Sequence, residues 1–425
     1  MNWEEDKEIV KRKLKSAWNY ARTFVRWLLI AGTTGAVGGL AGGLFHKAVD
    51  MATQVRTGNP WLVYFLPLAG LLIVFLYHLF KLDQDPGTNR VLVSVRSEKE
   101  VPAAMGPLIF VSTVLTHLFG GSAGREGAAL QLGGSIGAVL GKALHLDEKD
   151  RHIMIMCGMA GVFSALFGTP ITAMVFAMEV VSVGVMYYSG MFPCLASAYM
   201  AWWISSRLGN QATAFSLTGI PVITFGSSLR VMGLAASCAL VSILFCALMK
   251  YGHRWMAKAV PNPYLRAAAG GAAIILLTLL AGNGDYNGAG MDVIIKAVEG
   301  GKIFVFAFLL KIIFTAITIG SGYKGGEIVP TFFIGAAFGS VMGGFLGLSG
   351  GFGAGVGIIA MFCGVVNCPM ASIMLSMELF DGAGFVYFVM AVSVSYMLSG
   401  YYGLYSEQKI LYSKLRAEFI NINAK

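Results

Sequence analysis

Charged residues are scarce in this chain of 425 residues. Aspartate, glutamate, lysine and arginine make up 12% of the sequence, whereas hydrophobic residues make up 56%. In a typical soluble domain about a quarter of the residues are charged, and a soluble fold of this composition would leave a large apolar surface in water. A lipid bilayer is the better solvent, so we predict an all-α polytopic membrane protein.

The chain also has little that would support metal or nucleophilic chemistry. Its six cysteines lie in apolar segments without CxxC spacing, and its six histidines form no HExxH pattern. We interpret the cysteines as small buried side chains and expect no metal, no cofactor and no enzymatic activity. The net charge of +9 comes without a basic stripe interleaved with aromatic residues, so nucleic acid is not an expected partner.

Much of the positive charge lies at the two ends of the chain. The positive-inside rule places both ends in the cytoplasm and predicts a multi-pass protein of the cell membrane. Residues 1–23 are polar, with acidic as well as basic side chains, which favours an amphipathic cytoplasmic helix over a signal peptide. Residues 401–425 are expected to form a loop and one further cytoplasmic helix.

Glycine, in contrast, is abundant, with 55 residues. Apolar segments follow one another with short polar breaks, and several are shorter than the ~20 residues that an upright membrane span needs. Such segments are better interpreted as tilted, half-length or re-entrant helices, which are tolerated only inside a protein or around a cavity. This pattern is typical of a transporter or channel.

The sequence contains an internal repeat. Pro170–Glu179 and Pro369–Glu378 both read proline, seven mostly apolar or small residues, then Met-Glu. Upstream of each, a glutamate precedes a series of glycines with three residues between them. The matching glycines are Gly133, Gly137 and Gly141 in the first copy, and Gly335, Gly339 and Gly343 in the second. We interpret the glutamates that close the first pair of motifs as repeat-related structural groups.

The repeat divides the chain into two membrane halves, residues 24–206 and 230–400, joined by residues 207–229. Transporters built from two such halves hold their substrate near the middle of the bilayer, between the repeats. If each half crosses the membrane an odd number of times, the two halves have inverted topology.

Four loops carry the candidate chemistry. They are Asp85–Arg90, Gly124–Gly127, Gly320–Pro330 and Gly403–Ser406. The first three place glycines at or just before the start of a helix, where free backbone N–H groups and the helix dipole favour an anion. The hydroxyl of Tyr405 adds a donor, and so do Thr88 or Asn89. No combination of these groups supplies the several oxygens of a cation cage, so we predict an anion site built from helix ends.

Glu126 is the central candidate of that site. When ionised, its carboxylate would compete with an anion for the same donors, and when protonated it could swing away and carry a proton. One residue could thus serve as gate, anion mimic and proton carrier. The alternative is that Arg125 and Glu126 form a structural ion pair at a turn, and the residue types alone leave both interpretations open.

Two other charged groups lie near this constellation. Glu327 stands at the matching position of the second half; it could pair with Lys324 or Arg125, or itself take part in ion handling. Lys311 lies inside an apolar segment, and we expect it to neutralise a buried carboxylate such as Glu378 or Glu327.

At these residues the chain resembles the CLC family of anion channels and anion/proton antiporters. Gly124-Arg-Glu-Gly127 is similar to the family's gating-glutamate motif, Gly322–Pro330 to its third anion-binding loop, and Gly403–Ser406 to its tyrosine loop. The resemblance runs from the first span to Tyr405, with the motifs in order. It implies a homodimer with one pore per subunit, and a CLC-type inverted-repeat fold with many tilted and broken helices.

Departures from the usual family motifs bear on the substrate. Ala128 stands where most family members have a proline after Gly-Arg-Glu-Gly. Thr88-Asn89 stands where the usual first motif has its serine, and Glu327 enters the third motif. Val180 stands where proton-coupled chloride exchangers carry an inner glutamate. Together these departures resemble the bacterial fluoride/proton antiporter branch of the family.

That resemblance implies export of fluoride in exchange for protons, with Glu126 as gate and proton carrier. The residues expected to line the anion route are Gly87, Thr88, Asn89, Arg125, Gly127, Ile328, Val329 and Tyr405, with Glu327 and Lys324 as accessory residues. A chloride/proton exchanger or a passive chloride channel on the same scaffold is the alternative. The partners are therefore fluoride or chloride, protons, the lipid bilayer and a second copy of the chain.

Overall fold

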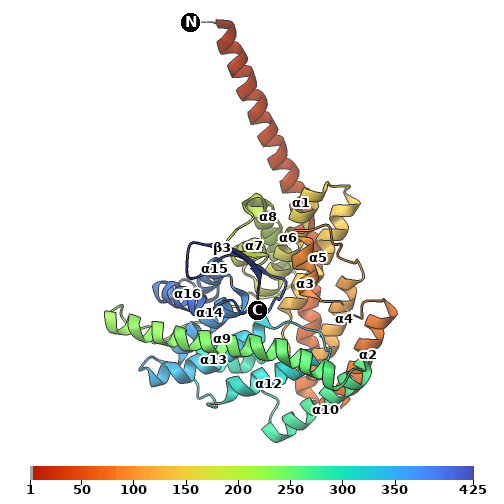
Figure 1. The fold of residues 1–425 in the computed structure, drawn as a ribbon, viewed down its shortest axis with the longest axis vertical. Coiled ribbons are helices and arrows are strands. Elements are labelled where there is room, and N and C mark those ends of the chain that lie inside the picture. Colours follow the sequence, from red (N-terminus) through yellow and green to blue (C-terminus); the bar gives the residue numbers. More distant parts are fainter. Residues whose placement is uncertain (1–2, 84) are drawn as a thin grey trace.

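The computed structural model describes residues 3–83 and 85–425, and these are mainly helical (Figure 1). The first half contains α1 (Trp3–Gly58), α2 (Leu66–Leu79), α3 (Thr88–Ser94), α4 (Met105–Leu118), α5 (Glu126–Ala143), α6 (Glu148–Phe167), α7 (Pro170–Glu179) and α8 (Met191–Arg207). The second half contains α9 (Phe225–Ala259), α10 (Pro263–Ala281), α11 (Met291–Val298), α12 (Ala307–Gly320), α13 (Ile328–Phe345), α14 (Gly350–Val366), α15 (Pro369–Phe380) and α16 (Phe385–Leu398).

The two halves match helix by helix. Helices α4 and α12 each have 14 residues, and α5 and α13 each have 18. The connection between the halves is shorter than predicted, because α9 begins at Phe225. Its start is fixed by a capping box, in which the Thr224 hydroxyl accepts the Ser227 N–H and the Ser227 hydroxyl accepts the Thr224 N–H.

The chain contains both membrane-length and shorter apolar helices. Among the described residues, six helical segments are long and apolar enough to cross a membrane, and six further apolar helices have 10 to 17 residues. The prediction of a mainly helical membrane protein with half-length helices is therefore confirmed. A short 3₁₀-helix, Pro60–Phe65, leads into α2, and another, Tyr188–Gly190, leads into α8.

The abundant glycines allow the central helices to pack with their backbones in contact. A Cβ on Gly133 of α5 would overlap the carbonyl oxygen of Gly158 in α6, and a Cβ on Gly335 of α13 would overlap that of Gly357 in α14. These are the repeat glycines, and they bring α5 against α6 and α13 against α14.

Helices α7 and α15 cap one another. The carboxylate of Glu179, at the end of α7, accepts the N–H groups of Met370 (3.1 Å) and Ala371 (2.8 Å) in the first turn of α15. The carboxylate of Glu378 accepts those of Ile171 (3.0 Å) and Thr172 (2.8 Å) in the first turn of α7. The structural role predicted for these glutamates is thus confirmed, and the reciprocity indicates a twofold relation between the halves.

The predicted N-terminal helix is present, whereas the C-terminal end differs from the prediction. Helix α1 continues without a break through residue 23, its first part projects away from the rest of the molecule (Figure 1), and residues 10–26 are exposed. The expected C-terminal helix is wrong: Lys409–Tyr412 (β2) and Phe419–Asn423 (β3) form an antiparallel pair, and Ser182–Val183 (β1) pairs parallel with β2. The alternation of apolar and polar residues in Phe-Ile-Asn-Ile-Asn suits a strand, because successive side chains of a strand point to opposite faces.

Candidate functional site

The starts of α5 and α13 lie side by side between the two halves. Gly124 and Gly326 form an isolated antiparallel bridge, with N–H···O distances of 2.6 and 2.7 Å. Helix α5 begins two residues after Gly124, at Glu126, and α13 begins two residues after Gly326, at Ile328. Glu126 therefore corresponds to Ile328, and Arg125 corresponds to Glu327. Glu327 is therefore not the counterpart of Glu126, as predicted, but stands one residue earlier, as the residue that precedes α13.

The carboxylate of Glu126 lies on the N-termini of both helices. Its Oε2 accepts the backbone N–H of Arg125 (3.0 Å) and of Val329 (3.3 Å). The residue is only 1% exposed, and its Oε1 has no hydrogen-bond partner among the described residues. Because free N–H groups and two helix dipoles converge here, the carboxylate occupies a position that suits an anion.

Arg125 pairs mainly with a residue that the sequence did not indicate. Its Nη1 lies 2.6 Å from Oδ1 of Asp50 in α1, whereas its Nε lies 4.0 Å from Oε1 of Glu126. The simple Arg125–Glu126 ion pair is thus only a long secondary contact. The available signal was a carboxylate within a mostly apolar stretch of α1, but its partner is 75 residues away in sequence.

The first predicted loop packs against α5. The hydroxyl of Thr88 donates to the carbonyl of Gly127 (3.2 Å) and accepts from Nε2 of Gln131 (3.2 Å). Gly87 has φ +62°, and a Cβ there would lie 3.1 Å from the same amide nitrogen. Sequence reasoning missed Gln131, although an amide side chain in an otherwise apolar helix is a usable signal.

Asn89 is engaged elsewhere, because its Oδ1 accepts the backbone N–H of Glu407 (3.1 Å). It therefore ties the first loop to the segment that follows Tyr405. Ile328 opens α13 with a wholly buried side chain, so it shapes the site through its packing.

The Tyr405 loop leaves a hydroxyl group free inside the protein. Tyr405 is 3% exposed, and its hydroxyl has no hydrogen-bond partner among the described residues. The loop is held by Gln408, whose backbone N–H donates to the Tyr405 carbonyl (2.9 Å). The amide of Gln408 donates to the carbonyls of Val180 (2.9 Å) and Val366 (2.8 Å).

The accessory residues do not pair as predicted. Within the described residues, no ion pair joins Glu327 to Lys324 or to Arg125. Lys324 instead lies over the ring of Tyr77, 4.3 Å from its centroid, because the loop turns the side chain toward α2. A Cβ on Gly127 would lie 3.1 Å from Oε2 of Glu327, so this carboxylate adjoins the Glu126 loop, and its role in ion handling stays a prediction.

Lys311 does not neutralise a carboxylate. Its ammonium group is wholly buried and donates to the carbonyls of Tyr286 (3.1 Å) and Gly288 (2.7 Å). Glu378 is already used as a helix cap, and within the described residues no ion pair joins Lys311 to Glu327. The backbone of the loop before α11 satisfies this cation instead.

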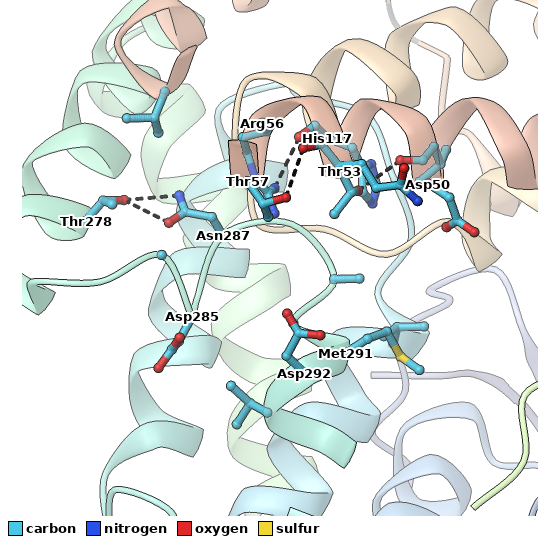
Figure 2. Close-up of a pocket in the computed structure, with 18 of the residues that line it drawn as sticks. Asp50, Thr53, Arg56, Thr57, His117, Thr278, Asp285, Asn287, Met291 and Asp292 are labelled. Carbon is cyan, nitrogen blue, oxygen red and sulfur yellow. Dashed lines mark hydrogen bonds between the residues drawn. The ribbon is translucent and has the colours of Figure 1, made fainter. Parts of the chain in front are cut away.

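A cavity of about 860 Å³ opens onto Glu126. Its lining includes Asp50 and Arg56 near the end of α1, His117 of α4, and Val329 and Asp292 from the second half (Figure 2). Since α1 begins at the opposite end from these residues, the cavity faces the side of the membrane away from the N-terminus. Glu126 lines this cavity, whereas Tyr405 does not belong to its lining.

The chain is similar in sequence to known proteins. A family model described as voltage gated chloride channel matches residues 69–400. A chloride/fluoride channel protein of Pseudomonas syringae pv. tomato is 32% identical over 396 residues, covering 92% of this chain and 87% of that protein. The H(+)/Cl(-) exchange transporter ClcA of Vibrio cholerae is 24% identical and covers 83% of this chain and 81% of that protein.

Solved structures show the same fold. The structure of a CLC-type fluoride/proton antiporter has a TM-score of 0.87 and 32% identity, covering 90% of this chain and 98% of that one. A slow cyanobacterial Cl⁻/H⁺ antiporter has a TM-score of 0.75 at 18% identity, covering 88% of this chain and 94% of that one.

Proposed function

Because this chain belongs to the voltage-gated chloride channel (CLC) family, we propose that it is a proton-coupled antiporter that exports fluoride across the cell membrane. The observation that carries the proposal is the position of Glu126. Its wholly buried carboxylate takes the backbone N–H groups of Arg125 and Val329 at the point where two helix N-termini meet.

Glu126 acts as the gate through its charge. When ionised, it holds the N–H of Val329 and blocks the route between the cavity and Tyr405. When protonated, it loses most of its attraction to these donors and leaves them to an anion. The proton arrives through the cavity, onto which Glu126 opens, so each visit of an anion is linked to a proton.

Fluoride is favoured as the anion because it is small, strongly hydrated and a strong hydrogen-bond acceptor. Its dehydration must be offset by donors inside the protein. The hydroxyl of Tyr405 is buried without a partner, and the N–H of Val329 becomes free when Glu126 leaves. The likeness to a protein described as a fluoride/proton antiporter, at 32% identity over 90% of the chain, supports this choice.

The end of α7 offers no free proton carrier among its described residues. Val180 is wholly buried and follows directly after α7. The neighbouring Glu179 uses both carboxylate oxygens to cap α15. Proton coupling therefore rests largely on Glu126.

We also infer how the protein is oriented in the membrane and how its subunits assemble. We place both termini in the cytoplasm, because basic residues gather there. We infer a homodimer in the lipid bilayer, with one anion route in each subunit. The cavity next to Glu126 then faces outward.

Transport by the purified protein in liposomes tests the proposal. Fluoride efflux is followed with an ion-selective electrode, and proton uptake with a pH-sensitive dye. We expect fluoride efflux to drive proton uptake, Glu126→Gln to abolish that uptake, and the exposed-loop control Glu98→Gln to keep it. Equal fluxes of fluoride and chloride would contradict the fluoride assignment, and fluoride flux without proton movement would indicate a passive channel.

A further inference from the structure

Two residues of α1 beside the gate are placed to share one proton. His46 and Asp50 are four residues apart and share one face of the helix. Nε2 of His46 lies 2.9 Å from Oδ2 of Asp50, and its Nδ1 lies 3.2 Å from the carbonyl oxygen of Leu166 in α6. A carbonyl can only accept a hydrogen bond, and so can an ionised carboxylate. Both ring nitrogens of His46 thus face oxygen atoms. These contacts suit a pair that holds one proton more than a neutral imidazole beside an ionised carboxylate.

This pair borders the cavity and is linked to the gate through Arg125. The His46 side chain is 11% exposed and that of Asp50 is 46% exposed, and Asp50 lines the cavity. The second oxygen of Asp50 accepts from Arg125, whose Nε lies 4.0 Å from Glu126. Three successive polar contacts thus connect the imidazole to the gating carboxylate.

We propose that His46 and Asp50 are positioning residues that make the charge around Glu126 depend on the pH of the cavity. This inference rests on the proposed function, because it requires Glu126 to take part in transport. When the pair loses its proton, a lone pair on Nε2 faces the carboxylate, and the 2.9 Å contact becomes repulsive. Asp50 then carries an uncompensated negative charge, which offsets more of the Arg125 charge beside Glu126.

The other charged groups around the pair do not replace it. Arg125 and Glu126 face it from α5, and α6 contributes only the Leu166 carbonyl. His117 of α4 donates from Nδ1 to the Thr113 carbonyl, and its Nε2 has no partner among the described residues, so its contacts require no extra proton. The other charged groups on the cavity wall are Arg56 of α1, Asp285 and Asp292.

The pH dependence of fluoride efflux tests this proposal. Rates are measured in liposomes at equal internal and external pH, from about pH 5 to about pH 8, the range in which histidine titrates. In His46→Gln, an amide can still donate to Asp50 but cannot bind the proton. We expect this variant to lose the pH-dependent inflection that the wild-type protein shows in this range, while its ratio of fluoride to protons stays unchanged.

A matched control is available on the surface. His78 lies 2.8 Å from Asp83 and its side chain is 69% exposed, outside the residues that line the cavity. His78→Gln should keep the wild-type profile. If His46→Gln does not elute as a monodisperse protein, Asp50→Asn decides, because it too should lose the inflection.

The proposed function and the role of the His46–Asp50 pair can be refuted separately. Proton uptake that persists in Glu126→Gln would overturn the proposed function. A wild-type profile in His46→Gln, or in Asp50→Asn where that variant decides, would overturn the inference about this pair while leaving Glu126 as the proton carrier.

Discussion

Removing the reciprocal caps of α7 and α15 should destabilise the protein unequally. Glu179 accepts two backbone N–H groups and is 5% exposed, so in Glu179→Ala water has little access to these donors. A hydrogen bond to a charged group contributes about 1.5–3 kcal/mol, so the two together contribute about 3–6 kcal/mol. Glu378 makes two equivalent bonds at a partly exposed position, and Ile171 is 46% exposed. For Glu378→Ala we expect the loss of about 0.5–2 kcal/mol that is typical of a helix cap.

Thermal unfolding of the purified variants in detergent measures this difference. The unfolding midpoint should fall furthest for Glu179→Ala, less for Glu378→Ala, and hardly at all for the exposed-loop control Glu98→Ala. The folded fraction of Glu179→Ala should keep the wild-type ratio of fluoride to protons. Equal midpoints for the two cap variants would refute the burial argument. A normal midpoint with lost proton coupling would show that Glu179 carries protons.

Two further predictions concern the C-terminal segment. Tyr405→Phe removes a hydroxyl group that bonds to nothing else among the described residues, so it should leave the unfolding midpoint unchanged. It should slow fluoride efflux about tenfold, the equivalent of about 1.4 kcal/mol; an unchanged efflux rate would exclude Tyr405 from the route. Burial lowers the pKa of Lys414, in the loop between β2 and β3, to about 8 from its ordinary 10.5. Between these values the unfolded chain binds a proton that the folded chain does not, so stability should rise with pH from 8 to 10.5. Lys414→Met should flatten that rise in a pH series of unfolding midpoints, and an undiminished rise would show that another group causes it.

The sequence predicted the features that short segments determine. The Gly124–Gly127 loop marks a helix start because glycines precede a long apolar run, and the structure begins α5 there. The Pro-to-Glu repeat predicted the matching starts of α7 and α15, at Pro170 and Pro369. Both are local patterns, in which a few neighbouring residues favour one backbone conformation.

The features that the sequence did not predict depend on contacts between distant segments. Asp50 pairs with Arg125, and Gln131 bonds to Thr88, and neither partner is near in sequence. Matching the two copies by their glutamates pairs Glu327 with Glu126. The spacing from the glutamate to the next matching glycine nevertheless differs by one residue between the copies. The helix starts show the true correspondence, because α5 begins at Glu126 and α13 begins at Ile328. A one-residue shift of this kind decides which side chain faces the anion position.

The reciprocal caps and the small sheet have a consequence for the synthesis of the protein. Part of the first half bonds to segments that are made much later: Glu179 caps a helix 191 residues further along, and β1 pairs with a strand that begins at Lys409. When residues 1–207 leave the ribosome, the first turn of α7 has no Glu378 and β1 has no neighbour. The first half therefore reaches its final structure only after nearly the whole chain has been translated. Truncated chains should be recognised and degraded as unfinished membrane proteins.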